Sequence, residues 1–238
     1  MMSMFDEFRQ LGSSLISDVL DEAGYHGQTL DPGIAAIGEA VSFCGPAVCV
    51  QGQRQVNTLN KPRDSSRMPL YDLPMMLNGP SVLVLATNGF RGGAVTGGLL
   101  AAELAGAGCA GLITDGLVRD LHELSAIGLP VRAAGMIPLN GARRFCLTGQ
   151  NAPVTMPAPE GGTVTIHPGD LVLGDQDGTV IVPQHAVTAI LVMGKELARR
   201  EDQLRQDAAR MTAAERATAR ATRMSHVEWL RDKDEALS

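Results

Sequence analysis

The chain has 238 residues and a formal net charge of −6 at pH 7, and its residues are 45% hydrophobic, 19% charged and 3% aromatic. This length suits one large α/β domain or two small ones, and the balance of apolar and charged residues excludes a disordered chain. The scarcity of aromatic rings and the acidic balance argue against nucleic-acid binding, and no stretch is long and apolar enough to span a membrane.

Local signals in the first half of the chain predict one helix and several strands. The helix is expected to begin at Ser13 or Ser14, either of which can cap it, and to run to about Ala23, with Gly24 ending it. The segments that follow are, in order, a strand pair over 40–51 broken at Gly45-Pro46, a long loop with a short helix over 52–73, and a strand buried on both faces over 81–86.

The second half begins with an alternation of strands, loops and helices. Its segments are, in order, a glycine-rich loop over 87–98, a helix over 99–108, a buried strand over 109–114, a turn at Asp115-Gly116, a helix over 121–127 and an extended segment at 129–131. A hairpin follows over 168–183, in which Asp177-Gly178 suits a type I′ turn. From about Gln184 onward one glycine and no proline occur, which predicts a long charged helix.

Charge is spread unevenly along the chain. Residues 1–194 carry 10 basic and 17 acidic side chains, whereas residues 195–238 carry 10 basic and 9 acidic side chains. We therefore expect an α/β domain over residues 1–183 and a helical extension over residues 184–238.

The compartment is indicated by the start of the chain and by the cysteines. Asp6 and Glu7 stand where a signal peptide would need basic residues and an apolar core. The four cysteines form no CxxC pair and lie in apolar surroundings. These features predict a cytoplasmic protein with reduced thiols.

The glycine-rich loop is the first candidate site. Its five glycines are Gly89, Gly92, Gly93, Gly97 and Gly98. Between a buried strand and a helix, free N–H groups and the helix dipole favour an anion such as a small carboxylate or a phosphate. No Gly-Lys-Ser/Thr of a Walker loop follows, and the spacing lacks the GxGxxG of a dinucleotide site, although Asp115 stands where a ribose-binding acid would lie. The alternative is that small residues only allow close helix–strand packing.

The second candidate is the segment from Asp115 to Asp120, at the carboxyl end of a buried strand, where open α/β sheets bind ligands. Arg119 offers planar recognition of carboxylate or enolate oxygens, and Asp120 is a hard oxygen ligand suited to Mg²⁺. The structural alternative is that Asp120 and Glu123 form a capping box and that Arg119 pairs with Asp115. Elsewhere, the five scattered histidines make a zinc site improbable, and no GxSxG motif of a serine hydrolase occurs.

Three stretches together resemble the RraA-like family, which includes 4-hydroxy-4-methyl-2-oxoglutarate (HMG) and 4-carboxy-4-hydroxy-2-oxoadipate aldolases and regulators of ribonuclease E activity. They are GGLLAAELAGAGCAGLITDGLVRDLHELSAIGLPV, LISDVLDEAG and HPGDLVLGDQDGTVIVP, so the resemblance spans about residues 13–205. It implies a swivelling ββα-type α/β fold, with a central sheet flanked by helices. It also implies a homotrimer or homohexamer with sites between subunits, in which the C-terminal extension packs on a neighbouring subunit.

The resemblance also implies roles for individual residues. Asp120 would ligate a divalent metal, Mg²⁺ or Mn²⁺, and Arg119 would lie beside the keto oxygen of the substrate. The backbone N–H groups of Gly98, Leu99 and Leu100 would hold the pyruvyl carboxylate. Glu201, in the C-terminal helix, matches a glutamate that enters the site of the neighbouring subunit; the alternative is an exposed helix acid.

One residue departs from the pattern of the family. Aldolase members usually carry an acidic residue at the position of Gly98, where it supports the metal's waters. Loss of such a partner lowers metal affinity or activity on the order of 10- to 100-fold.

The resemblance, together with the Arg119–Asp120 segment, thus implies a divalent-metal-dependent C–C lyase that cleaves a 2-oxo dicarboxylic acid through a pyruvate enolate, with Arg119, Asp120 and Glu201 as catalytic residues. The reaction would be retro-aldol cleavage of HMG, decarboxylation of oxaloacetate, or both. A non-enzymatic regulator that binds a ribonuclease is the alternative, which Gly98 favours. A sugar-acid aldolase or an isomerase with the same enolate chemistry is a third hypothesis.

Overall fold

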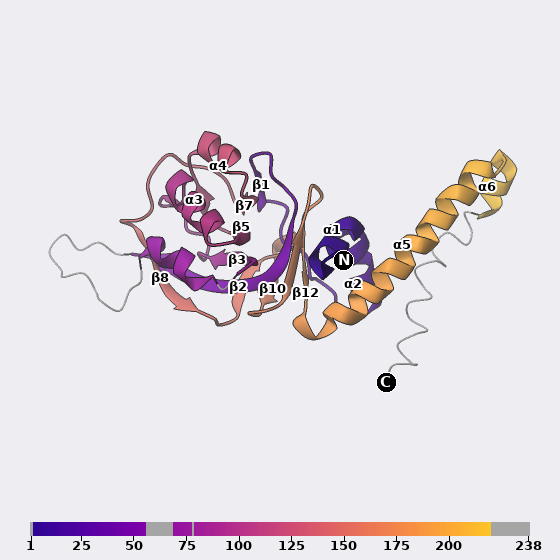
Figure 1. Cartoon of the computed structure of the whole chain (residues 1–238), viewed down its shortest axis with the longest axis horizontal. Helices are drawn as coiled ribbons and strands as arrows, with labels where there is room; N and C mark the ends of the chain where they lie inside the picture. Colours follow the sequence, from indigo (N-terminus) through magenta and orange to yellow (C-terminus); the bar gives the residue numbers. More distant parts are fainter. Residues whose placement is uncertain (1, 56–68, 78, 220–238) are drawn as a thin grey trace.

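A computed structural model describes residues 2–55, 69–77 and 79–219 of the chain (Figure 1). These residues form a mixed α/β fold on a curled central sheet, from which a long C-terminal helix projects (Figure 1). Residues 56–68 of the predicted loop and 220–238 of the predicted helical extension lie outside the described residues.

The centre of the sheet is parallel and its margins are antiparallel. The parallel strands, in their order across the sheet, are β7 (Val131–Ala133), β5 (Cys109–Thr114), β3 (Ser81–Ala86) and β2 (Phe43–Arg54). The antiparallel strands are β1 (Ala35–Ile37) beside β7, β11 (Leu171–Gly174) and β8 (Phe145–Gln150) beside β2, and β12 (Thr179–Val182) beside β11. The strands predicted over 81–86 and 109–114 are confirmed.

Three groups of elements cover this sheet, which is why its central strands are apolar on both faces. On one face, Leu83 and Leu85 pack beneath the helical elements η1 (Leu70–Met76), α3 (Gly98–Gly106) and α4 (Leu121–Ile127). On the other face, Val82 and Val84 pack against the hairpin of β9 (Val154–Pro157) and β10 (Thr163–Ile166). The strands β11 and β12 are covered by α1 (Met4–Leu11), α2 (Ser13–Glu22) and the first half of α5 (Val187–Arg210).

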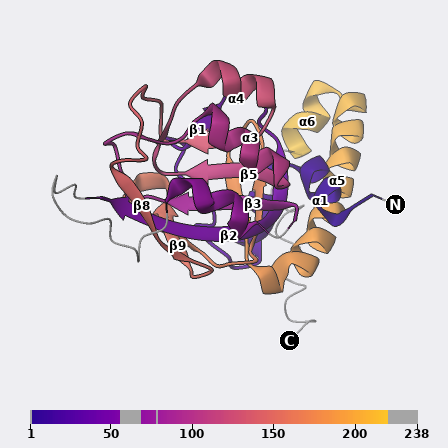
Figure 2. The same ribbon diagram turned by 60° about the vertical axis from the view of Figure 1, so that its left-hand side comes forward.

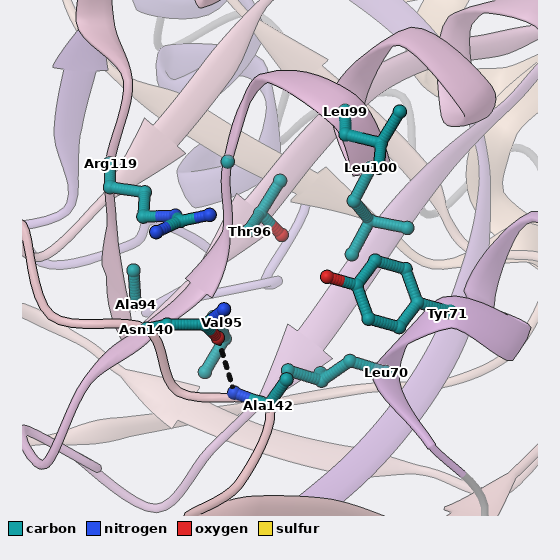
Figure 3. Close-up of a pocket in the computed structure, with 11 residues that line it drawn as sticks. Leu70, Tyr71, Ala94, Val95, Thr96, Leu99, Leu100, Arg119, Asn140 and Ala142 are labelled. Atoms are coloured by element: carbon teal, nitrogen blue, oxygen red, sulfur yellow. Dashed lines mark hydrogen bonds between the residues drawn. The ribbon is translucent and has the colours of Figure 1, made fainter.

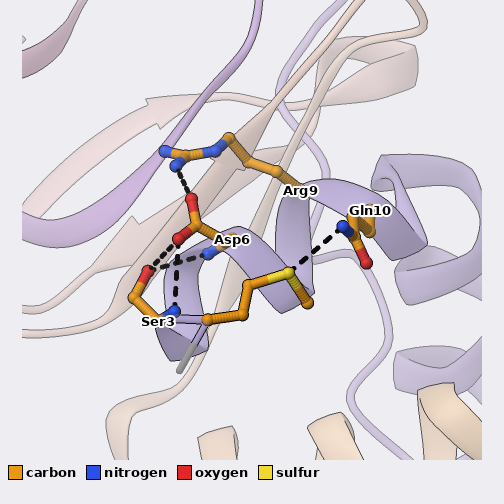
Figure 4. Close-up of polar contacts among 5 residues, drawn as sticks. Ser3, Asp6, Arg9 and Gln10 are labelled. Atoms are coloured by element: carbon orange, nitrogen blue, oxygen red, sulfur yellow. Dashed lines mark hydrogen bonds and ion pairs between the residues drawn. The ribbon is translucent and has the colours of Figure 1, made fainter.

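Helix α1 begins in a capping box that the sequence analysis did not anticipate (Figure 4). The Ser3 hydroxyl accepts the Asp6 N–H at 3.2 Å, and the Asp6 carboxylate accepts the Ser3 N–H at 3.2 Å and pairs with Arg9. The hydrogen bonds from Ser3 lower the pKa of Asp6 below its ordinary value. Together these contacts hold the helix so that Phe8 is fully buried against α2 and α5.

The predicted helix from residue 13 is confirmed, but the predicted serine cap is wrong. The N-cap is Gly12, with φ +81°. Ser13 instead donates its N–H and its hydroxyl to the Asp175 carboxylate at 2.7 and 2.6 Å, and Ser14 donates its hydroxyl to Asp177 at 2.8 Å. Both serine side chains thus bind the β11–β12 hairpin instead of capping α2. These bonds tie the helix to the hairpin.

The hairpin is also confirmed, whereas its type I′ turn is wrong. Neither Asp177 nor Gly178 has the positive φ that a type I′ turn requires. The connection is a four-residue loop closed by the Asp175 N–H donating to the Gly178 carbonyl at 3.0 Å. The Asp175 side chain accepts the Asp177 N–H, so an Asx turn shapes the loop.

The predicted break at Gly45-Pro46 is wrong, because β2 runs through it as one strand of 12 residues. Ala47 donates its N–H to the Asp170 carbonyl on the β11 side at 2.8 Å. Successive residues of a strand direct their backbone nitrogens to opposite sides, so the Pro46 nitrogen faces β3. The pairing of β2 with β3 begins only at Ala47. The missing N–H of Pro46 therefore removes no bond from the sheet.

The long helix predicted from residue 184 begins as a 3₁₀ turn, η3 (Gln184–Ala186), continues as α5 and is followed by α6 (Ala213–Ala219). The first half of α5 buries Ile190 and Leu197 with α1 and α2, and Lys195 pairs with Glu7 at 2.8 Å. The second half leaves the body of the protein (Figures 1 and 2). No helix within the described ranges combines the length and the apolar character needed to cross a membrane.

All four cysteines are buried free thiols. Burial raises the pKa of Cys44 and of Cys49 to about 12. Both side chains therefore stay protonated at neutral pH and act as packing groups.

Candidate functional site

The candidate site lies where the neighbouring parallel strands β3 and β5 end. A short strand follows each of them: β4 (Ala94–Thr96) after β3 and β6 (Leu117–Val118) after β5. The two short strands pair in parallel, and the Arg119 N–H donates to the Thr96 carbonyl at 3.0 Å. This pairing places the start of α3 directly beside Arg119 and Asp120.

Asp115, the first acid after β5, serves the fold. Its side chain accepts the Thr87 N–H at 2.5 Å, the Thr87 hydroxyl at 2.8 Å and the Gly89 N–H at 2.7 Å, and the residue is 4% exposed. These bonds hold the turn after β3 to the end of β5. Asp115 is therefore neither the ribose ligand of a dinucleotide site nor the partner of Arg119.

Asp120 lies at the N-cap position of α4 but makes no side-chain cap, so the structural alternative of a capping box with Glu123 is wrong. Its backbone has φ +64°, a left-handed conformation that aspartate tolerates better than most residues. This conformation turns the carboxylate away from α4 and toward α3. There Oδ2 accepts the Gly98 N–H at 3.1 Å and lies 3.3 Å from Arg119 Nε, and the Asp120 side chain is 32% exposed.

The glycine-rich loop divides into two parts with different roles. Gly89 bonds to Asp115, and a Cβ at Gly93 would lie 2.7 Å from Gly141 Cα, so this part of the loop serves turns and close packing. At Gly97, a Cβ would lie 2.5 Å from Asp120 Oδ2 and 2.9 Å from Arg119 Nε. Glycine at this second position makes room for the Arg119–Asp120 pair.

Of the three backbone donors expected in the first turn of α3, Gly98 already donates to Asp120, which corrects that expectation, whereas Leu99 and Leu100 stay candidates. The N-cap Gly97 offers no side chain, and the Ala101 N–H is taken by the Gly97 carbonyl at 3.0 Å. The Gly98 N–H is taken by Asp120. The N–H groups of Leu99 and Leu100, at positions that have no partner within a helix, are thus left to receive a ligand beside Arg119.

A small hollow of about 30 Å³, open to solvent, adjoins this turn (Figure 3). Leu70, Val95 and Leu100 form part of its apolar wall. Its polar lining includes Arg119, Thr96 and Tyr71, and Figure 3 shows the Thr96 and Tyr71 hydroxyls pointing into the space between them, with the Arg119 guanidinium beside Thr96. Thr96 is 2% exposed, and its hydroxyl has no hydrogen-bond partner among the described residues.

Glu123 fills the space that Gly98 leaves open. A Cβ at residue 98 would overlap the Glu123 carboxylate and lie 2.7 Å from Glu123 Cβ. The exposed Glu123 carboxylate therefore lies over Gly98, in the first turn of α3. The N–H of the same Gly98 donates to Asp120. An acid from α4 occupies the region where an acidic side chain at position 98 would begin.

Glu201 does not join this group within one chain. It lies on the part of α5 that projects away from α3 and α4 (Figure 1), and its carboxylate pairs with Arg205 at 3.3 Å.

The donor set suits one kind of metal site. Within the described ranges, no three His, Cys, Asp or Glu side chains gather as a metal cage. Mg²⁺ usually keeps several waters and takes only one or two carboxylates, so a single half-buried carboxylate such as Asp120 fits it. The same set does not fit a structural zinc ion, which needs four nitrogen or sulfur ligands.

Two residues of the site were missed by sequence reasoning. Thr96 stands in the run AVTGG, where a single hydroxyl among small residues was the available signal. Glu123 was considered only as a helix cap. Its place over Gly98 depends on how α4 packs beside α3, which no local pattern reports.

A family model and several named proteins match much of the chain. The family model RraA-like, described as Aldolase/RraA, matches residues 13–181. A protein of Albidiferax ferrireducens named "Putative 4-hydroxy-4-methyl-2-oxoglutarate aldolase" is 32% identical over 154 residues, which are 65% of this chain and 84% of that protein. Protein DlpA of Legionella pneumophila is 24% identical over 80% of this chain, which spans only 29% of the length of DlpA.

A solved structure shows the same fold. The crystal structure of Streptomyces coelicolor RraAS2, an unusual member of the RNase ES inhibitor RraA protein family, superposes with a TM-score of 0.72 and 25% identity, covering 86% of this chain and 97% of that one. It shares the mixed α/β fold, with a curled sheet and a long C-terminal helix. The chain therefore belongs to the RraA-like aldolase family.

Proposed function

We propose that the protein is a divalent-metal-dependent C–C lyase that cleaves a 2-oxo dicarboxylic acid. Retro-aldol cleavage of HMG breaks the C3–C4 bond, takes the proton from the C4 hydroxyl and adds one to C3, which gives two pyruvates. Decarboxylation of oxaloacetate gives CO₂ and pyruvate. Both reactions pass through the enolate of pyruvate.

Each part of the site has a role in this proposal. The N–H groups of Leu99 and Leu100 bind the carboxylate of the 2-oxo acid, assisted by the dipole of α3. Arg119 lies beside the oxygen on which negative charge develops, where a preorganised cation stabilises the transition state. A Mg²⁺ or Mn²⁺ ion held by Asp120 would supply Lewis-acid polarisation of the 2-oxo group.

The C-terminal helical segment supplies the remaining acid. We assign Glu201, from a second copy of the chain, to the site formed by Arg119 and Asp120. Of the expected extension over residues 184–238, the first half of α5 packs on its own chain, so the part assigned to the neighbouring subunit begins in the second half of α5. The projecting half of α5 supports this arrangement, because it carries Glu201 away from its own chain (Figure 1). A homotrimer or a homohexamer would then hold complete sites.

The observation that carries the proposal is the orientation of Asp120. A carboxylate at a helix N-cap ordinarily accepts the N–H groups of its own helix. Asp120 instead contacts the start of α3 and Arg119 and stays partly exposed, so it remains available to a ligand.

The test is release of pyruvate from HMG and from oxaloacetate by the purified protein. We expect release with Mg²⁺ or Mn²⁺, and its loss with a chelator. Asp120→Asn is expected to lower the rate at least about 100-fold, because the amide is a poor ligand for a hard cation. Absence of pyruvate from both acids, or an unchanged rate in the variant, would contradict the proposal.

A second candidate function is a non-enzymatic regulator that binds a ribonuclease. The likeness in fold to a member of the RNase ES inhibitor family favours it. Metal dependence separates the two functions, because masking a ribonuclease surface needs neither Asp120 nor a divalent ion.

A further inference from the structure

The hollow beside Arg119 contains a buried hydroxyl that the fold does not use. Thr96 Oγ1 is buried and lacks a hydrogen-bond partner among the described residues, which is an unfavourable state for a polar group. The backbone of Thr96 is engaged, since its carbonyl accepts the Arg119 N–H. The hydroxyl alone is therefore left without a hydrogen bond among the described residues, and Figure 3 shows it pointing into the hollow.

The lining of this hollow describes what it can receive. Three of its walls are the apolar side chains of Leu70, Val95 and Leu100, which favour a compact apolar branch. Thr96, Tyr71 and Arg119 are among its polar lining residues, the hydroxyls of Thr96 and Tyr71 point into the same space, and no carboxylate belongs to the lining. The hollow thus suits a small oxygen-bearing acid that has a methyl-sized branch.

We propose that the Thr96 hydroxyl hydrogen-bonds the half of the substrate that lies beyond the breaking C–C bond, and that it selects acids bearing a hydroxyl or carboxylate oxygen there. The inference rests on the proposed lyase function, in which the first turn of α3 holds the pyruvyl half. The pyruvyl half is polar and unbranched, so the apolar wall of the hollow matches the half of the substrate beyond the breaking bond. Thr96 is then a specificity-determining residue of the site.

A second threonine provides a matched control. Thr179, on β12, also has a hydroxyl without a partner among the described residues, and it is 3% exposed, but it lies outside this hollow. Thr96→Val and Thr179→Val each remove one unpartnered buried hydroxyl with little change of shape. Both variants are expected to melt at or above the temperature of the unmodified protein, because no folded-state hydrogen bond is lost.

The experiment measures binding of two inert acids by calorimetry in the presence of Mg²⁺. Citramalate carries the tertiary hydroxyl, the methyl and the carboxylate of the outer half of HMG, whereas oxalate resembles only the pyruvyl half. We expect Thr96→Val to weaken citramalate binding about 10-fold, as for the loss of a hydrogen bond, and to change oxalate binding less than about 2-fold. Thr96→Ser, which keeps the hydroxyl, is expected to restore citramalate binding, and Thr179→Val to leave both affinities unchanged.

The outcomes separate this inference from the function on which it rests. Equal citramalate affinity in the unmodified protein and in Thr96→Val overturns the inference and leaves the lyase intact. Equal weakening of citramalate and oxalate overturns the assignment of Thr96 to the outer half. If the unmodified protein binds neither acid, the inference and the proposed function both fail.

Discussion

Two aspartates that follow the same strand, five residues apart, differ in what their carboxylates bind. Asp115 is buried and accepts three hydrogen bonds from the turn after β3, so its carboxylate is consumed by the fold. Asp120 stays one-third exposed, leaves its own helix uncapped and meets Arg119. An acid at the end of a buried strand is thus a candidate ligand only when the chain has not already satisfied it.

Replacing Asp115 is expected to produce the largest change in stability. In Asp115→Asn, one carboxylate oxygen becomes an NH₂ group that faces the donors of Thr87 or Gly89. We expect a loss of about 3 kcal/mol in the free energy of unfolding, measured with urea. The matched variant Asp120→Asn is expected to lose less than about 1 kcal/mol, because its carboxylate is partly exposed. Equal losses would erase the distinction between the two aspartates.

Replacing Arg119 tests the functional side of the comparison. Arg119→Lys keeps the charge but removes the planar fork that can bind two oxygens at once. We expect pyruvate release to fall about 10- to 100-fold, which corresponds to about 1.4 to 2.7 kcal/mol of transition-state stabilisation, with no change in the melting temperature. An unchanged kcat/KM would remove Arg119 from the site.

The packing of Glu123 over Gly98 predicts a smaller effect. Gly98→Ala places a Cβ against Glu123 and is expected to lower the free energy of unfolding by about 1 kcal/mol. Gly106→Ala is the control in the same helix, because nothing lies within 4 Å of its Cβ, and it should be neutral or stabilising by up to about 1 kcal/mol. Adding Glu123→Ala to Gly98→Ala removes the carboxylate but keeps the Cβ of residue 123, so it should recover part of the loss. Additive effects in this double-mutant cycle would contradict the contact.

The smallest expected effect concerns pH. Burial acts to raise the pKa of Asp175, but the hydrogen bonds from Ser13 and from the hairpin backbone outweigh it and lower that pKa below 3.8. Because the folded-state pKa is the lower one, this stabilisation is present above pH 3.8 and is lost as the pH falls through the folded value. Asp175→Asn should therefore be less stable than the unmodified protein by about 1 kcal/mol at pH 6, with the difference shrinking below about pH 3.8. A difference in the free energy of unfolding that stays constant down to pH 2 would exclude this linkage.

The parts of the fold that the sequence predicts are those with a strong local pattern. The apolar runs of β3 and β5 and the helical spacing of α2 carry their own signal. Strands β8, β9 and β10 were not anticipated, because half of their residues face solvent and their pairing is set by β2 or by each other. The continuity of β2 through Pro46 depends on where β3 begins to pair, which is a property of the assembled sheet.

The candidate site divides in the same way. Arg119 and Asp120 could be predicted, because adjacent charges at a strand end are visible in one sequence. The left-handed backbone of Asp120, which separates a ligand from a helix cap, appears only in three dimensions. The unpartnered hydroxyl of Thr96 likewise arises from the pairing of β4 with β6, two short strands that have no sequence signature.

The most direct test of the central claim is the melting temperature of the unmodified protein and of Asp120→Asn with Mg²⁺ and oxalate, added separately and together. We predict that the unmodified protein is stabilised by several degrees only when both are present, because a ligand that binds the folded state raises its stability. Asp120→Asn should show no such joint effect. A joint shift of equal size in the variant would contradict the assignment of Asp120 as the residue that holds the metal.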